Sequence, residues 1–169
     1  MDAKDAILKR RSVRKFLEKE VPRELIDKLI EAGDSAPSAC NKRPIDIYVI
    51  TNKEKLAALS QSGRFTGMTS PLAIVVAGDM SRTLPRSFKD YWIHDAAAAT
   101  ENILIMATAL GLGSCWCGVH LQKSVEDGVR EVLGLDESTM PFSLIHIGYP
   151  AEIPEPHSGY SPERVKFIE

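Results

Sequence analysis

The sequence has few cysteines, no long apolar run and no excess of one charge, and each shortage excludes a class of protein. Its 169 residues include three cysteines, an odd number that is too small for a disulfide framework and typical of a reducing compartment. No run approaches the roughly 20 consecutive apolar residues of a membrane span. The 21 basic and 23 acidic residues give a formal net charge of −2, which argues against nucleic-acid binding through a broad basic face.

Two further absences concern targeting and nucleotide binding. The first residues, MDAKDAILKRR, place acids before a short apolar group and lack the pattern of a secretory signal, so a cytoplasmic location is expected. The GxxxxGK[ST] phosphate loop is missing, and GLGSCWCG lacks the GxGxxG spacing of a Rossmann fingerprint. Any phosphate group would therefore be held by other means.

What the sequence does contain is an alternation of helical and strand patterns, which fits one domain over residues 1–169. The predicted helices are a short one capped by Asp2 and then residues 22–33, 54–61, 91–110 and 123–133. The predicted strands are 45–50, 72–77, a short one within 111–118, and 142–147. The alternation alone favours a parallel α/β sheet with helices on both faces.

Several of these helices carry signals at their ends or along their length. Gly33 and Gly134 are expected to end their helices in a left-handed conformation. Ser124 and Asp127 have the spacing of a capping box. The helix over 91–110 is apolar almost all round, which predicts that it lies at the centre of a core or of a subunit interface.

The C-terminal segment, residues 148–169, contains four prolines and ends in RVKFIE. Prolines at this density disfavour a helix and predict an extended arm that could end in a strand. An arm of this length has to lie on a surface, and a partner subunit is a natural one.

The most concentrated positive charge in the chain is RRSVRKF, residues 10–16. Arg10 and Arg14 share a face if the run is helical, and Ser12 joins them if it is extended. Guanidinium groups bind phosphate oxygens in pairs, and a serine hydroxyl adds a donor. The run therefore indicates a site for a phosphate monoester, with a solvated basic surface as the alternative.

Four segments, in this order, make the chain resemble the nitroreductase family: RRSVRKF, APSACNKRP, HDAAAATENILIMATALGLGSCWCG and IHIGYP. The resemblance covers nearly the whole chain. It implies an α+β, three-layer fold with a central, mostly antiparallel sheet flanked by helices and an extended C-terminal arm. It also implies a homodimer that binds FMN at its interface. NAD(P)H would reduce the flavin and leave, and a small acceptor such as a nitroaromatic or a quinone would follow in a ping-pong mechanism.

The resemblance gives the basic run a specific role in binding FMN. Arg10 and Ser12 are expected to hold the phosphate and ribityl end of the cofactor. Arg14 is expected near N1 and O2 of the ring, and Arg11 can share the role of its neighbours. Because the chemistry belongs to N5 of the flavin, no catalytic side chain is expected.

Two other segments are expected to contact the flavin. The first is a loop that reaches it from the other subunit through Pro37, Ser38, Ala39 and Asn41. The second follows the long helix and approaches the cofactor through the backbone of Gly113, Ser114 and Cys115. An ordinary polar loop and a glycine helix stop are the respective alternatives.

The chain departs from the family pattern in two places. Arg43, Pro44 and Ile45 stand where the family often has Gln, Pro and an aromatic residue, which bears on the substrate pocket. Gly159 occupies a frequent position of a basic residue that contacts the phosphate. Two nearby cations could take over that contact, namely Arg164 and Lys166.

The cysteine pair has a structural interpretation. Cys115 and Cys117 face the same side of a strand, and without a second pair we expect them to pack in the core rather than to bind zinc.

The alternative to a reductase is a protein that stores or senses FMN without rapid turnover. Such a protein would keep the same binding segments as a reductase. The sequence does not separate these two functions.

Overall fold

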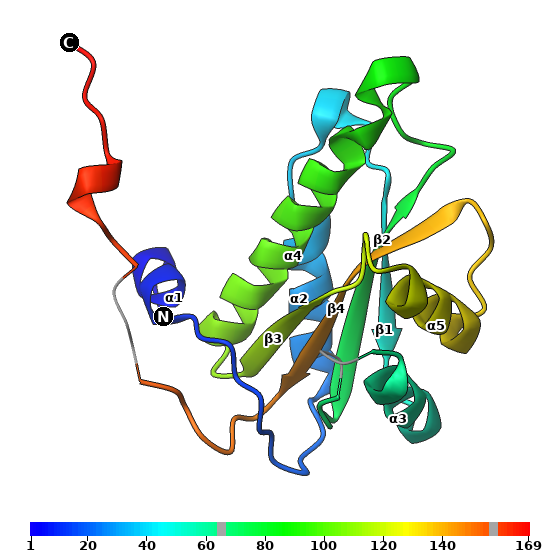
Figure 1. The fold of residues 1–169 in the computed structure, drawn as a ribbon. Helices are drawn as coiled ribbons and strands as arrows, with labels where there is room; N and C mark the ends of the chain where they lie inside the picture. Colours follow the sequence, from blue (N-terminus) through cyan, green and yellow to red (C-terminus); the bar gives the residue numbers. More distant parts are fainter. Residues whose placement is uncertain (64–66, 156–158) are drawn as a thin grey trace.

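The computed structural model describes residues 1–63, 67–155 and 159–169. A four-stranded antiparallel sheet lies between helices (Figure 1). Its strands, in the spatial order β1-β2-β4-β3, are β1 (Ile45–Ile50), β2 (Leu72–Asp79), β4 (Thr139–Gly148) and β3 (Gly113–Gly118). The antiparallel sheet implied by the resemblance is confirmed, and the parallel sheet favoured by alternation alone is wrong. The reason is that β1 and β2, and likewise β3 and β4, are neighbours in the sheet that run in opposite directions although a helix lies between them in the sequence.

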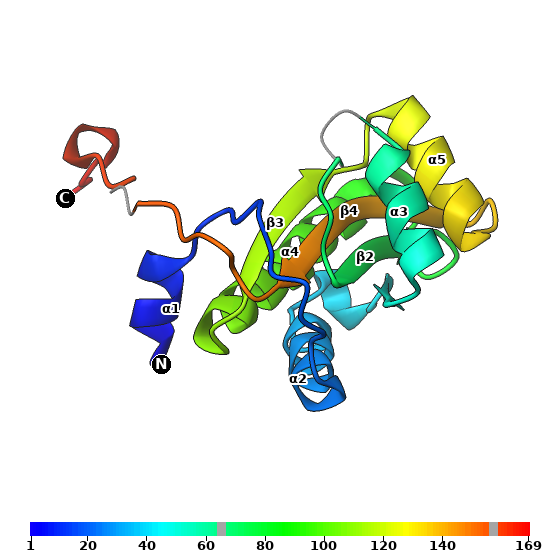
Figure 2. The same cartoon turned by 90° about the horizontal axis from the view of Figure 1, so that it is seen from below.

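Helices lie on both faces of the sheet, and the first helix packs against the fourth rather than against the sheet. They are α1 (Ala3–Lys9), α2 (Arg23–Asp34), α3 (Lys53–Gln61), α4 (Trp92–Ala109) and α5 (Lys123–Leu133). Figure 2 shows α2 on one side of the sheet and α3 and α5 on the other. Each layer encloses its own hydrophobic cluster, and β2 contributes to both because its residues 72–78 are buried on both faces. Among the described residues, no helix is long and apolar enough to cross a membrane.

The central position predicted for the long apolar helix is confirmed in α4. Ile103 and Leu104 of this helix are buried in the cluster that also contains Ile74 of β2 and Ile145 of β4. Because α4 also packs against α2 and α1, residues around most of its circumference are at least partly buried.

The predicted role of Gly33 as a helix stop is wrong. Gly33 lies inside α2, and a Cβ atom there would come within 2.9 Å of side-chain carbons of Ile103 and Ile47. The glycine is therefore needed for the close approach of α2 to its neighbours. Gly134 does end α5 in the left-handed conformation, with φ 67°, as predicted.

The capping box predicted at the start of α5 is also wrong. The helix begins at Lys123 with Gln122 as its N-cap residue, so Ser124 lies inside the first turn. The side chain of Gln122 makes no capping hydrogen bond, and Glu126 of the first turn instead accepts from Leu121 N at 2.8 Å. The spacing of Ser124 and Asp127 matches a capping box, but the helix starts too early to use it.

The predicted C-terminal arm is confirmed, whereas the strand at its end is wrong. After β4, the chain first runs beside the basic segment, where Phe16 bridges Pro150 and Ala151 N donates to the Lys15 carbonyl at 2.9 Å. It then leaves the body, with a short 3-10 helix at Pro162–Arg164 and no strand over residues 165–169. A strand needs a neighbour to pair with, and residues 165–169 have none within their own subunit among the described residues.

Candidate functional site

The basic segment, defined as residues 10–16, is extended because α1 ends immediately before it. Ser12 forms a parallel bridge with Ser114 of β3, and Val13 N donates to the Ser114 carbonyl at 2.9 Å. Val13 itself is buried. In an extended chain, alternate side chains share a side, so Arg10, Ser12 and Arg14 lie on the side opposite to Val13.

The thiol of Cys115 on β3 hydrogen-bonds with Ser12 and lies within the electrostatic reach of Arg14 and Arg10. The pKa of Cys115 is lowered to about 7. The largest cause is a hydrogen bond with Cys117, which raises the pKa of Cys117 in turn. Burial opposes the lowering, while the positive charge of Arg14, a hydrogen bond with Ser12 and the charge of Arg10 contribute to it. The structure therefore brings four predicted site residues into one polar, positive cluster.

Arg10 is oriented by a carboxylate of α4. Its Nε lies 3.2 Å from Oε1 of Glu101, and the arginine side chain is 31% exposed. This ion pair uses Nε, at one edge of the guanidinium, and the two terminal nitrogens make no hydrogen bond or ion pair with a described residue. A planar group held at one edge and open at the other is suited to pair with two oxygens of a phosphate.

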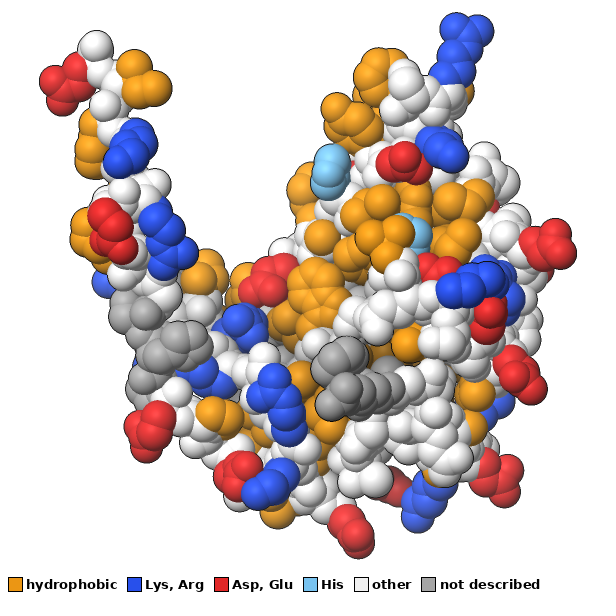
Figure 3. Space-filling model, in the orientation of Figure 1, with side chains coloured by type: hydrophobic (Ala, Val, Ile, Leu, Met, Phe, Trp, Pro, Cys, Tyr) orange, Lys and Arg blue, Asp and Glu red, His pale blue; other side chains and the backbone are white. Residues whose placement is uncertain are grey.

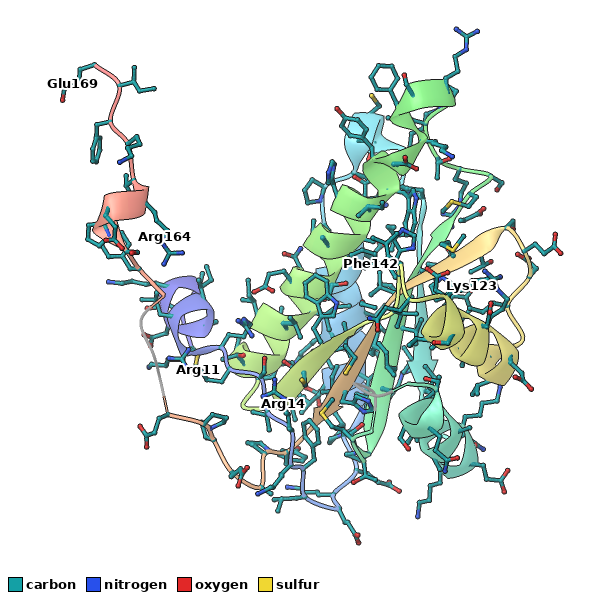
Figure 4. All side chains as sticks on the ribbon, viewed as in Figure 1. Arg11, Arg14, Lys123, Phe142, Arg164 and Glu169 are labelled. Carbon is teal, nitrogen blue, oxygen red and sulfur yellow. The ribbon has the colours of Figure 1, made fainter. Side chains whose placement is uncertain are left out.

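The other two arginines of the basic segment differ from each other. Arg14 is exposed, and its guanidinium makes one long hydrogen bond, 3.4 Å, to the Ser12 carbonyl. Arg11 instead turns back toward α1, where its Nη1 donates to the carbonyl oxygens of Leu8, at 2.9 Å, and Arg10, at 2.7 Å. Figure 4 shows both side chains on the segment between α1 and β3. Arg11 thus satisfies carbonyl groups at the end of α1.

The two glycines before β3 have different roles. Gly111 has φ 74° and follows α4, so it is the helix stop. At Gly113, a Cβ atom would lie 2.8 Å from side-chain carbons of Val13. Gly113 therefore permits the close approach of the basic segment to β3. Ser114, which follows it, is buried, and its carbonyl accepts the hydrogen bond from Val13.

The predicted contact loop, extended here to residues 37–43, is held by a different part of α4. Ala39–Asn41 form a 3-10 turn, and Ala39 N donates to Oδ1 of Asp95 at 2.9 Å. Asp95 lies in the first turn of α4, six residues before Glu101, which is about 9 Å along the helix axis. Pro37 and Asn41 are exposed. Within one subunit, the structure therefore does not bring this loop to the Arg10 cluster (Figure 1).

The two arm cations are also apart from the cluster. Arg164 Nη2 donates to the Gly159 carbonyl at 3.2 Å within the arm itself, and Lys166 is exposed. Figure 4 shows Arg164 on the arm, beyond α1. Contact of either side chain with a phosphate remains a prediction.

The predicted packing of the cysteine pair is observed. Cys115 and Cys117 are buried on one face of β3, with 4% and 3% exposure. Cys117 belongs to the hydrophobic cluster under α3 and α5. Within the described parts of the chain, no group of three His, Cys, Asp or Glu side chains is placed to hold a metal ion.

Sequence reasoning gave no positioning role to Asp95 or Glu101, the two acids that hold the loop and Arg10. Both lie in the segment HDAAAATEN, where the surrounding residues are mostly alanine. An acidic side chain on an apolar helix is costly to bury unless it has a partner. That cost is a signal for Asp95, which is buried, but not for Glu101, whose side chain is 43% exposed.

Comparison with known proteins places this site in a family. The model of the Nitroreductase family matches residues 7–63 and 63–149. A relative from Methanothermobacter thermautotrophicus, named as a candidate NADH dehydrogenase/NAD(P)H nitroreductase, is 38% identical over 167 residues, which cover 98% of this chain and 86% of the relative.

Two solved structures extend the likeness to the fold. An FMN-dependent nitroreductase from Clostridium difficile has a TM-score of 0.87 and 33% identity, with 97% of this chain and 98% of that chain covered. A candidate nitroreductase in complex with FMN from Desulfovibrio desulfuricans has a TM-score of 0.84 and 26% identity, with 100% and 98% covered. The family match spans most of the sequence and includes the basic segment, the contact loop and β3, and the chain therefore belongs to the nitroreductase family.

Proposed function

We propose that the protein is an FMN-dependent oxidoreductase that takes electrons from NAD(P)H and passes them to a small acceptor such as a nitroaromatic or a quinone. The observation that carries this proposal is the convergence of Arg10, Ser12 and Arg14 beside Cys115. Family membership and relatives named for FMN and NAD(P)H support it. When bound, FMN supplies hydride chemistry at N5, so the protein has to bind and orient it.

The cluster fits the phosphate end of this cofactor. The two open nitrogens of Arg10 and the hydroxyl of Ser12 would hold the phosphate and ribityl end, and the Glu101 ion pair fixes the orientation of the Arg10 guanidinium. Arg14 would lie near N1 and O2 of the ring, where its positive charge favours the reduced form. The backbone of residues 113–115 would line the same site, since Gly113 keeps it close to the basic segment.

We infer that two copies form a homodimer with two composite sites. The Arg10 cluster and the loop at residues 37–43 are held at different points along α4, by Glu101 and by Asp95. Because the resemblance implies that this loop reaches the flavin from the other subunit, we infer that each site combines the cluster of one copy with the loop of the other. The arm exposes apolar side chains, with Phe167 and Ile168 at 87% and 96% exposure. Figure 3 shows the arm standing apart from the body, whose facing side carries gathered hydrophobic side chains. A partner subunit would cover both surfaces, and it could bring Arg164 or Lys166 to a phosphate.

The experiment that tests this function starts with the colour of the purified protein. We expect a yellow protein that releases FMN and not FAD, because the chain has one phosphate cluster and no second nucleotide motif. Without oxygen, NADH or NADPH should bleach the flavin, and a quinone or nitroaromatic should restore the colour. Bound FMN that neither nucleotide bleaches would instead indicate a storage or sensor protein. A chain that takes up no FMN would refute the proposal.

A further inference from the structure

The contact loop at residues 37–43 has an unusual backbone. Cys40, Asn41 and Arg43 all have left-handed conformations, with φ of 52°, 52° and 48°. None of them is glycine, and side chains with a Cβ atom disfavour this region. A loop with three such residues keeps its shape only when surrounding contacts hold it.

Three side chains supply these contacts. Ala39 N donates to Oδ1 of Asp95 at 2.9 Å, and Arg43 N donates to Oγ of Ser38 at 2.9 Å. From the other side, Nη1 of Arg82 donates to the Arg43 carbonyl at 2.7 Å. Ion pairs with Asp46 and Asp79 hold the Arg82 guanidinium in turn. The loop is thus fastened at its start, across its middle and at its end.

Asp95 differs from the other restraints because it is buried. It is 6% exposed and sits in α4 beside buried Ala96 and Ala99. Among the described residues, Ala39 N is the hydrogen-bond donor that its side chain accepts from. A carboxylate in an apolar setting is costly, and the positive end of the helix dipole at the first turn of α4 offsets part of that cost. A buried acid that accepts one backbone N–H fixes the position of that N–H.

We propose that Asp95 is a positioning residue for the FMN site of the opposite subunit. It fixes Ala39, and with it the exposed residues Pro37 and Asn41, before a flavin arrives. This inference rests on the proposed function, because it requires a composite site that contains FMN. Its effect is preorganisation: the loop meets the cofactor of the partner without first being ordered.

The first test compares variants of Asp95 by FMN titration. Asp95→Ala should weaken FMN binding by roughly 10-fold, the loss expected for one hydrogen bond to a charged group. Asp95→Asn keeps an oxygen that accepts the Ala39 N–H, so it should restore affinity to within about threefold of wild type. As a control, Asp90→Ala removes an equal charge from an exposed residue before α4 and should leave the affinity for FMN unchanged.

A second variant reaches the same contact from the loop. Ala39→Pro removes the donated N–H and leaves α4 unchanged. Proline is tolerated at the first position of a helical turn, and the preceding Ser38 is extended, with φ −134° and ψ 150°, as a residue before proline prefers. This variant should fold and should lose FMN affinity as Asp95→Ala does. Wild-type affinity in either variant would overturn the proposal.

Mixed dimers test whether the loop acts on the opposite subunit. In a dimer of one Arg10→Ala chain and one Asp95→Ala chain, purified through two different tags, one site receives both defects and the other receives neither. One FMN per dimer should then bind with wild-type affinity. When both substitutions are on one chain and the other chain is wild type, each site has one defect, and no site should bind with wild-type affinity. A merely structural defect would not follow this pattern.

The outcomes separate this inference from the proposed function. If the wild-type chain takes up no FMN, the proposed function fails. If the wild type binds FMN and the pattern of the mixed dimers is reversed, the loop serves its own subunit and the inference about Asp95 is wrong. The proposed function survives that second result.

Discussion

The basic segment and the C-terminal arm both carry cations that are expected to contact the phosphate of FMN, but only those of the basic segment are held in place by the body of their own subunit. The basic segment lies against β3, with Val13 buried and Arg10 held by Glu101. In the arm, Arg164 contacts the carbonyl of Gly159 in the same short turn. One group of cations is positioned by the body of its own subunit, and the other is not.

This difference determines how much each group of cations contributes to the free energy of FMN binding. A mobile cation has to be ordered when the ligand arrives, and the entropy lost in ordering offsets much of the attraction. The guanidinium of Arg10 is already oriented, so most of its attraction to a phosphate remains available. We therefore expect the affinity for FMN to depend on the basic segment far more than on the arm. The predictions below test this comparison.

The largest effect is expected at Gly113, where the basic segment meets β3. A Cβ atom in Gly113→Ala would lie 2.8 Å from Val13, so the variant should lose roughly 1–3 kcal/mol of unfolding free energy, as overpacked sites do. FMN affinity should fall with it. Gly118→Ala on the same strand is the control, because its Cβ would meet Gln122 at an ordinary 3.6 Å. Equal melting temperatures in the two variants would contradict the close approach.

The next effect concerns the potential of the flavin. Removing the charge in Arg14→Ala should lower the midpoint potential, because a cation beside N1 and O2 favours the reduced form. A loss of roughly 1.4 kcal/mol of differential stabilisation corresponds to about 30 mV for a two-electron couple. Affinity for oxidised FMN should change little. Redox titration with a dye standard measures the shift, and an unchanged potential would reject the ring contact.

A smaller effect should appear as a function of pH. Because the pKa of Cys115 is lowered to about 7, its thiol is neutral at pH 6 and largely a thiolate at pH 8, beside Arg10 and Arg14. A negative charge there competes with the phosphate, so FMN affinity relative to a Cys115→Ser variant should fall by about threefold, roughly 0.6 kcal/mol, as pH rises between these values. The variant corrects for titration of the phosphate itself. A ratio that is constant with pH would place the thiolate away from the phosphate.

The smallest effect is expected in the arm. Arg164→Ala and Lys166→Ala should each weaken FMN binding by less than about 1 kcal/mol, the range for exposed ion pairs. Isothermal titration of both variants beside the wild type provides the measurement. A loss at Arg164 as large as that at Arg10 would show that the partner subunit positions the arm as firmly as β3 positions the basic segment.

Local features of the fold could be predicted from the sequence where they depend on neighbouring residues. Gly134 ends α5, and α4 lies at the centre, because a left-handed stop and an all-round apolar pattern are local properties. The role of Gly33 could not be predicted, since it depends on contacts with Ile47 and Ile103 from other elements. The direction of the strands likewise depends on tertiary packing.

The candidate site divides in the same way. The basic run indicated an anion site because its charge is concentrated in seven residues. Its sequence did not show that Arg11 would turn back to the carbonyl groups at the end of α1, while the terminal nitrogens of Arg10 stay available to a ligand. The contact between Ala39 and Asp95 joins residues 56 positions apart, a separation at which one sequence gives no pairing information.

The central claim is that the basic segment holds the phosphate of FMN, and comparison of FMN with riboflavin tests it most directly. Riboflavin has the same ring and ribityl chain and lacks the phosphate. Arg10→Ala should weaken binding of FMN by roughly 1.5–3 kcal/mol, the range for a hydrogen bond to a charged group, and leave the affinity for riboflavin unchanged. An equal loss of affinity for both ligands would show that Arg10 does not contact the phosphate and would contradict the account.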